Sequence, residues 1–212
     1  MDEVVQCLTR TRDACTRLGN ELAKDFKLDP AAPPINAFTW CFNSTTLTLE
    51  TCSYYSERFK LQQATTAPTI AMARQQNGER VVMQTKAHFL FALSSMEAAA
   101  RQATELHPSA VPLDQTKKWQ YLSNILGKSH ALGLIDAPSK KLWDGLIFIR
   151  NTVVHNNGVG SGDFKLACPN GVTLSVVKGA MIQGTVGTFA DLTEWAVESY
   201  ALWCRGFLKR AL

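Results

Sequence analysis

An arginine, an asparagine and a histidine lie close together in one segment of the chain, at Arg150, Asn151 and His155. A histidine can act as a general acid or base near neutral pH, and a guanidinium can stabilise negative charge that develops on phosphorus. Cleavage of RNA without a metal needs a base for the 2′-hydroxyl proton, an acid for the leaving oxygen and a cation for the phosphate. The segment therefore contains residue types suited to metal-independent phosphodiester cleavage.

These residues end an apolar segment that predicts a helix over 137–157. At 100° per residue, Asn151 and His155 form an i, i+4 pair on one face, and Gly158 is a helix C-terminal signal that puts His155 in the last turn. Arg150 lies about 140° from His155 around the axis, so we expect a shared site only at the helix flank or across a dimer. Two adjoining apolar stripes of this helix should be buried. The first consists of Leu142, Leu146, Ile149 and Val153, and the second of Trp143, Ile147 and Val154, with Arg150 among them.

The charge of Arg150 needs a partner, because an unpaired buried charge is costly. Glu97 is the candidate carboxylate, on a helix predicted over 81–106, and Arg101 lies one turn further along that helix. The alternative to a site role for Arg150 is an ion pair that only locks the bundle. For His155 the alternative is a helix-end residue that bonds a carbonyl, and we favour the site role.

Other residues have plainer interpretations. Gly145, inside the predicted motif helix, indicates close approach by another helix, with a dimer partner as one candidate. We expect the remaining histidines to be structural or exposed, and four of the tryptophans to lie in the core or in an interface. These residues are His88, His107 and His130, with Trp119, Trp143, Trp195 and Trp203.

The run Arg150-Asn151-Thr152-Val153-Val154-His155 resembles the signature of the HEPN superfamily, which has an arginine, a polar residue directly after it and a histidine a few residues later. The resemblance covers roughly residues 81–210 and is specific around 142–158. It implies an up-and-down helical bundle that dimerises across the motif helices. It also implies catalytic roles for Arg150, Asn151 and His155, since many members are metal-independent ribonucleases of toxin, antiphage or RNA-processing systems. Other members have lost catalysis and serve as binding modules.

The remaining pattern predicts a mainly α, single-domain protein, an up-and-down bundle with a small β-hairpin before the last helix. Residues 1–80 should form a helical element packed on an HEPN-like bundle of residues 81–212. Apolar periodicity predicts helices over 2–25, 38–62, 81–106, 114–132 and 137–157, with residues 64–79 as loop or partial helix. Asp2 is a candidate cap for the first helix.

Two further signals concern the end of the chain. Alternating apolar residues on either side of Pro169-Asn170-Gly171 predict the hairpin: Phe164, Leu166 and Cys168, then Val172, Leu174 and Val176. Thr188 and Asp191 have the spacing of a capping-box variant that would open the last helix.

Composition excludes several classes of protein. The chain has 212 residues with a net charge of +4, which permits an RNA or phosphate partner without requiring one, and no lysine-rich groove flanks the motif. The six cysteines form no C-x-x-C pair and no zinc-ligand spacing with histidine, so we expect no metal, disulfide or cofactor. The start of the sequence lacks the pattern of a secretory leader, and no apolar run is long enough for a membrane span. We therefore expect a cytoplasmic protein.

Three functional hypotheses remain. The favoured one is a homodimeric, metal-independent endoribonuclease with RNA as substrate and an antitoxin or regulatory protein as a candidate partner. The second is a non-catalytic HEPN-like module that binds a partner protein or nucleotide. The third is a structural helical protein in which the motif is coincidental.

Overall fold

A computed structural model describes residues 1–63, 67–114, 116, 119–169, 173–182 and 185–212 of the chain. Within these residues it contains six helices and one two-stranded antiparallel hairpin, which lies directly before the last helix. The predicted mainly α fold with a small hairpin in that position is therefore confirmed. The elements are α1 (Asp2–Phe26), α2 (Asn36–Gln63), α3 (Pro68–Leu106), α4 (Leu122–Ala131), α5 (Ala137–His155), β1 (Phe164–Ala167), β2 (Thr173–Val176) and α6 (Thr188–Ala211).

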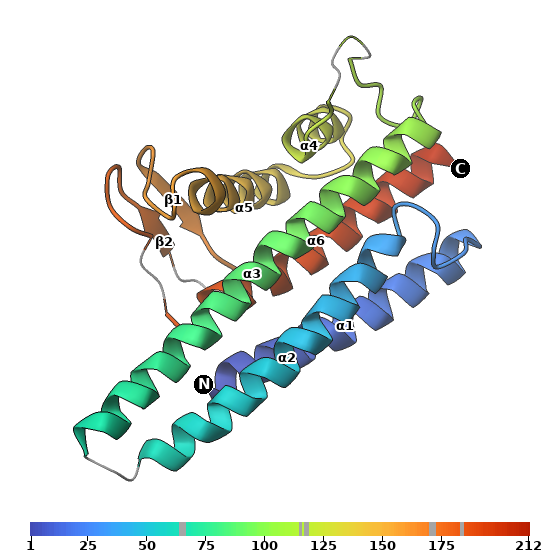
Figure 1. The fold of residues 1–212 in the computed structure, drawn as a ribbon. Helices are drawn as coiled ribbons and strands as arrows, with labels where there is room; N and C mark the ends of the chain where they lie inside the picture. The colour runs from blue at the N-terminus through green and yellow to red at the C-terminus, as the bar shows by residue number, and fades with distance from the viewer. Residues whose placement is uncertain (64–66, 115, 117–118, 170–172, 183–184) are drawn as a thin grey trace.

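Four long helices form the body of the molecule. Figure 1 shows α1, α2, α3 and α6 running along one diagonal, with α4, α5 and the hairpin on one side of α3 and α6. Each long helix packs against two others, in the pairs α1 with α2, α2 with α3, α3 with α6 and α6 with α1. The motif helix α5, which carries Arg150, Asn151 and His155, contacts α3, α4, α6 and β1. These four elements hold the helix in place.

Helix α6 supplies three of the largest side chains of the core. Trp203, Tyr200 and Phe207 are fully buried, and the Trp203 ring stacks on both of the other rings. The polar atoms of two of these rings are satisfied, because Trp203 Nε1 donates to Ser129 Oγ at 2.9 Å and the Tyr200 hydroxyl donates to the Pro34 carbonyl at 3.2 Å. These bonds connect α6 to α4 and to the segment between α1 and α2.

The hairpin packs on the motif helix. Leu166 of β1 pairs with Leu174 of β2, and both are buried, as the alternation of apolar residues predicted. The predicted turn lies mostly outside the described residues, which exclude 170–172. A Cβ atom on Gly145 of α5 would lie 2.6 Å from Leu166 Cδ1. The expectation that another helix approaches Gly145 was wrong, because the close neighbour is strand β1. A glycine in a helix indicates that something packs closely there, but not which element it is.

Three predicted helix boundaries also need correction. The helix expected over 114–132 begins only at Leu122, because Asp114 Oδ1 accepts hydrogen bonds from the Thr116 amide and hydroxyl and so forms a turn. The helix expected over 81–106 begins at Pro68 instead. The stretch 64–79 is therefore partly helical, one of the two alternatives predicted for it, while residues 64–66 lie outside the described part. Helix α5 ends at His155, two residues before the predicted boundary.

The two predicted caps are not formed. Asp2 is the first residue of α1 and makes an ion pair with Lys60 at 2.6 Å. The N-cap of α6 is Gly187, and the Thr188 hydroxyl accepts a hydrogen bond from the Thr185 amide at 2.8 Å. Both caps were predicted from local sequence, but in the folded chain the Asp2 side chain pairs with Lys60 and the Thr188 side chain bonds to Thr185.

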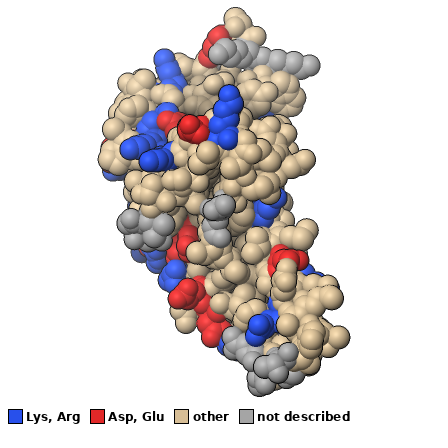
Figure 2. Space-filling view, turned by 90° about the vertical axis from the view of Figure 1, so that its left-hand side faces the viewer, with Lys and Arg blue, Asp and Glu red and all other residues tan. Residues whose placement is uncertain are grey.

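Charged residues are distributed widely over the surface. On the face drawn in Figure 2, lysines and arginines are interspersed with aspartates and glutamates. None of the helices in the described part of the chain combines the length and the apolarity that a membrane span requires.

Candidate active site

Helix α5 positions the motif through a cap at each end. Asp136 Oδ1 accepts a hydrogen bond from the Ser139 amide at 2.8 Å, and a proline occupies the first turn. At the other end, the Gly158 amide donates to the Thr152 carbonyl at 3.0 Å, and Gly158 has a φ of 86°, which favours glycine. The prediction that His155 lies in the last turn is confirmed, and His155 is the last helical residue.

Burial along α5 follows the prediction in part, since Leu142 and Ile147 are only partly buried. Trp143, Leu146 and Ile149 are fully buried, and Val153 is nearly so. Val154, expected in the second buried stripe, is 49% exposed. In the last turn of α5 only the side that carries Val153 is buried, so the second stripe is exposed to solvent at Val154.

The three motif residues share one cavity, which we call the motif cleft. It has a volume of about 370 Å³, within the range of small-ligand sites. The cleft lies between α3, the start of α4 and α5, and is lined by Glu97, Tyr121, Leu122, Ser123, Ile147, Arg150, Asn151 and His155. Arg150 and His155 diverge around the helix, but the cleft lies at the helix flank, where both side chains can reach it within a single chain.

Arg150 is paired with Glu97, as considered from the sequence. Arg150 Nη1 lies 3.4 Å from Glu97 Oε2, and the two side chains are 26% and 16% exposed. This separation exceeds the 2.7–2.9 Å typical of charge-assisted hydrogen bonds. Arg150 Nε is buried without a hydrogen-bond partner among the described residues. The Arg150 guanidinium is therefore paired with Glu97 without a short hydrogen bond, and it keeps N–H donors that have no acceptor in the described part of the chain.

Asn151 and His155 are exposed on α5. Neither side chain makes a hydrogen bond or ion pair with another residue in the described part of the chain, so the alternative of a His155 that bonds a carbonyl is not observed there. Both side chains are free to contact a ligand in the motif cleft.

The start of α4 adds a feature that the sequence analysis missed. Tyr121 is the N-cap of α4 and makes no side-chain capping bond, so the first amides of this helix lack a side-chain acceptor. Leu122 and Ser123, which follow it, line the motif cleft. An uncapped helix N-terminus favours an anion such as a phosphate. This terminus was missed because the helix predicted over 114–132 places residues 121–123 inside the helix and not at its start.

Arg101, predicted as a supporting residue, does not line the cleft. Its guanidinium carbon lies 5.2 Å from the centre of the Trp119 ring, in a cation–π contact. Trp119 itself is exposed and so does not lie in the core, whereas Trp143 and Trp203 are buried as predicted.

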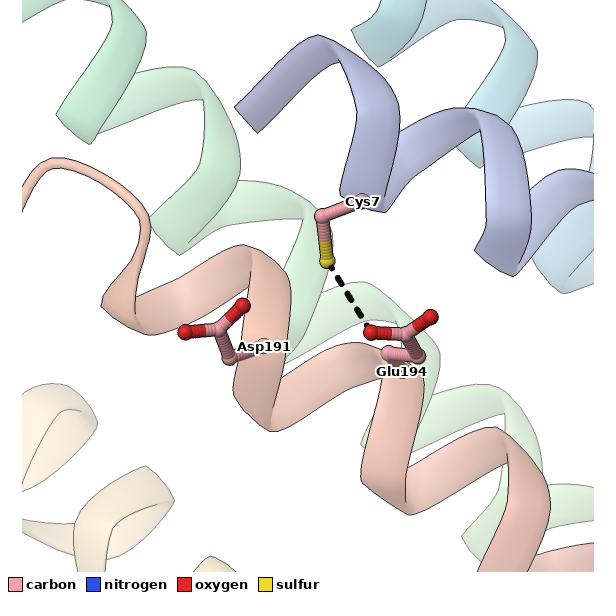
Figure 3. A group of neighbouring side chains, drawn as sticks. All are labelled: Cys7, Asp191 and Glu194. Atoms are coloured by element: carbon pink, nitrogen blue, oxygen red, sulfur yellow. Dashed lines mark hydrogen bonds between the residues drawn. The ribbon is translucent and has the colours of Figure 1, made fainter. Parts of the chain in front are cut away.

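A second polar cluster connects α1 and α6 far from the motif in sequence. In Figure 3, Cys7 points toward Glu194, with Asp191 one turn earlier on α6. Their ligand atoms lie within 4.8 Å of one another, so these three residues could hold a metal ion by distance alone. However, Arg10 already binds both Glu194 oxygens, at 2.7 and 2.9 Å, and the Cys7 thiol donates to Glu194 at 3.4 Å. Burial, followed by the charge of Glu194, raises the pKa of Cys7, which keeps the thiol protonated. These contacts favour a polar link between helices over a metal centre.

His88 has a structural role, as expected. It is buried between α2 and α3, with Nδ1 3.0 Å from Ser44 Oγ and Nε2 3.1 Å from Thr45 Oγ1. Burial lowers the pKa of His88 to about 4, so the imidazole is neutral at physiological pH.

Comparisons of the chain with protein-family models, curated proteins and solved structures found no match. The resemblance to the HEPN superfamily therefore stays a prediction that rests on residues 142–158 and on the helical character of the chain.

Proposed function

We propose that this protein is a metal-independent endoribonuclease of HEPN type. The observation that carries the proposal is the motif cleft, in which Arg150, Asn151 and His155 meet beside the uncapped start of α4. His155 and Arg150 supply the base and the cation that phosphodiester cleavage by an internal hydroxyl requires, and the Asn151 amide and the helix N-terminus can bind and stabilise the phosphate.

In the proposed reaction, His155 takes the proton of a ribose 2′-hydroxyl. The resulting oxygen attacks the adjacent phosphorus, the bond from phosphorus to the 5′-oxygen breaks, and that oxygen receives a proton. The products are a 2′,3′-cyclic phosphate and a 5′-hydroxyl. Arg150 and the first amides of α4 stabilise the charge on the phosphate oxygens, and Asn151 orients the ribose or phosphate by hydrogen bonding.

The ion pair with Glu97 suits this role of Arg150. At 3.4 Å, the carboxylate holds the guanidinium in the cleft without a short hydrogen bond. A phosphate can then take the unused donors of Arg150 while Glu97 still limits the movement of the side chain.

A homodimer completes the proposed mechanism. One imidazole cannot serve as neutral base and protonated acid in the same step, whereas a two-fold dimer across the α5 helices presents two. The partner copy of His155 would protonate the leaving oxygen.

The test is cleavage of single-stranded RNA by the pure protein in excess EDTA. We expect 2′,3′-cyclic phosphate ends, and no cleavage of DNA or of 2′-O-methyl RNA, which lack the nucleophile. His155→Ala and Arg150→Ala should each lower the rate by roughly 10²- to 10⁴-fold. His107→Gln, which changes a histidine outside the motif cleft, serves as the control and should cleave normally. Absence of cleavage by the wild-type dimer, or a strict need for a divalent metal, would refute the proposal.

A non-catalytic module that binds a nucleotide is the second candidate. It is favoured by the pairing of the one arginine of the cleft with Glu97, which lowers the net positive charge available to a long RNA. Binding of a nucleotide that depends on Arg150, without cleavage of any RNA, would support this candidate instead.

A toxin or antiphage setting, and a neutralising partner protein, belong to the same proposal. Growth arrest on expression of the wild-type chain, but not of His155→Ala, would support a toxin.

A further inference from the structure

Two exposed aromatic side chains lie beside the motif cleft. Trp119 is 55% exposed and Tyr121 is 58% exposed, and Tyr121 lines the cleft together with the three motif residues. Tyrosine and tryptophan are enriched at binding interfaces, because each combines a large apolar face with a polar group.

The same face of α3 anchors Trp119 and the motif arginine. Arg101 contacts the Trp119 ring, and Glu97, four residues earlier on α3, pairs with Arg150. Residues four apart on a helix are neighbours on one face, so the indole is held at a defined place relative to the cleft. The backbone between the two aromatics is also held, because Gln120 Nε2 donates to the Asp114 carbonyl at 2.6 Å.

The two rings lie close together in the chain, directly before α4. Tyr121 is the N-cap of α4 and has an extended backbone, with φ −75° and ψ 154°. Trp119 lies two residues earlier, and Arg101 of α3 contacts its ring. The pair therefore consists of one ring that lines the cleft and a second ring two residues before it in the chain.

The surroundings of these rings select the kind of ligand. Exposed aromatic faces can bind organic cations or stack on nucleobases. Arg101 already places a positive charge against the Trp119 ring, so a cationic ligand is disfavoured there. Arg150 in the cleft is paired with Glu97 but keeps a donor without a partner among the described residues. A nucleobase, whose phosphate is drawn to Arg150 and the start of α4, fits both the rings and the charges.

We propose that Trp119 and Tyr121 form a base-stacking platform for nucleotides that flank the phosphate in the motif cleft. This inference rests on the proposed function, and it makes unpaired RNA the substrate. The bases of a duplex already stack on their neighbours and are not available to the rings.

The experiment measures binding separately from cleavage. A 2′-O-methyl oligonucleotide has no nucleophile, so its affinity for the wild-type protein reports binding alone. Trp119→Ala and Tyr121→Ala should each weaken binding of the single strand by roughly 5- to 150-fold, the loss of one stacked base. Trp119→Phe and Tyr121→Phe should keep most of the affinity, and binding of the corresponding duplex should change little.

Tyr54→Ala is the matched control. Tyr54 on α2 is also an exposed ring in contact with an arginine, Arg58, but it does not line the motif cleft. This variant should bind the single strand like the wild type. Thermal unfolding of every variant checks that the fold is intact.

The outcomes separate the platform from the proposed ribonuclease. Unchanged single-strand affinity in both alanine variants, or an equal loss in Tyr54→Ala, overturns the platform, even when the wild type cleaves RNA. Loss of affinity in the two alanine variants alone supports the platform, even when the wild type cleaves nothing.

Discussion

The Arg150–Glu97 pair is open to a direct measurement of stability. Glu97→Gln leaves a partly buried guanidinium without its carboxylate, so it should lower the free energy of unfolding. Fully buried pairs lose several kcal/mol on such a change and exposed pairs almost nothing, so a pair of intermediate burial should lose about 1–2 kcal/mol. Urea denaturation would measure the change.

Glu198→Gln provides the control for that measurement. Glu198 is exposed on α6 and has no ion-pair partner among the described residues, so its substitution should leave the stability unchanged. Equal stabilities for Glu97→Gln and the wild type would show that the pair contributes nothing to folding.

His88 should make the stability depend on pH. Its pKa is lowered from 6.5 to about 4 by burial, so between these values the unfolded chain binds a proton that the folded chain does not. The contribution of neutral His88 to the free energy of unfolding is therefore fully present above pH 6.5, decreases as the pH falls, and is lost by pH 4. The two pKa values correspond to a loss of about 3 kcal/mol.

Chemical denaturation of the wild type and of His88→Gln, at several values between pH 4 and pH 7, would test this expectation. Glutamine offers a donor and an acceptor to Ser44 and Thr45 but does not titrate. The variant should lose less stability than the wild type over this range. Parallel curves for the two proteins would exclude His88 as the cause.

Two helical glycines should respond in opposite ways to the same substitution. A Cβ on Gly206 of α6 would lie 2.6 Å from the Leu134 carbonyl oxygen, whereas a Cβ on Gly78 of α3 meets nothing within 4 Å. Gly206→Ala should therefore destabilise the protein by about 1–3 kcal/mol, since a backbone must move. Gly78→Ala should stabilise it by about 0.5–1 kcal/mol, since alanine is the better helix former.

Thermal unfolding of both variants checks the pair of predictions. A neutral Gly206→Ala would contradict the packing of α6 on the α4–α5 connection, and a destabilising Gly78→Ala would contradict the open space beside Gly78 on α3. The first comparison bears on the motif cleft because the connection joins α4 to α5, and both helices line the cleft.

The proposed composite site requires a second copy of the chain. Sedimentation velocity at micromolar concentration should therefore show a homodimer, and dilution that dissociates the dimer should reduce RNA cleavage in parallel. Full activity in a monomer would place both proton transfers in a single motif cleft and would exclude the composite arrangement.

Local patterns in the sequence were enough to predict most of the elements. Helical spacing of apolar residues located α1, α2, α5 and α6, and the alternation around Leu166 and Leu174 located the hairpin. The position of His155 at the end of α5 also followed from the sequence, because Gly158 acts on its own helix. These features depend on interactions between residues close in the chain, which a one-dimensional pattern records.

The contents of the motif cleft depend on interactions between distant segments. Glu97 was identified because an arginine in an apolar stripe needs a carboxylate, but nothing in the sequence indicated that Tyr121 and Ser123 would lie opposite His155. The exposed Trp119 and the cluster of Cys7 with Glu194 were hidden for the same reason. Such contacts arise when helices far apart in the chain pack together, and the free energy of that packing is shared among many side chains, so no single spacing encodes it.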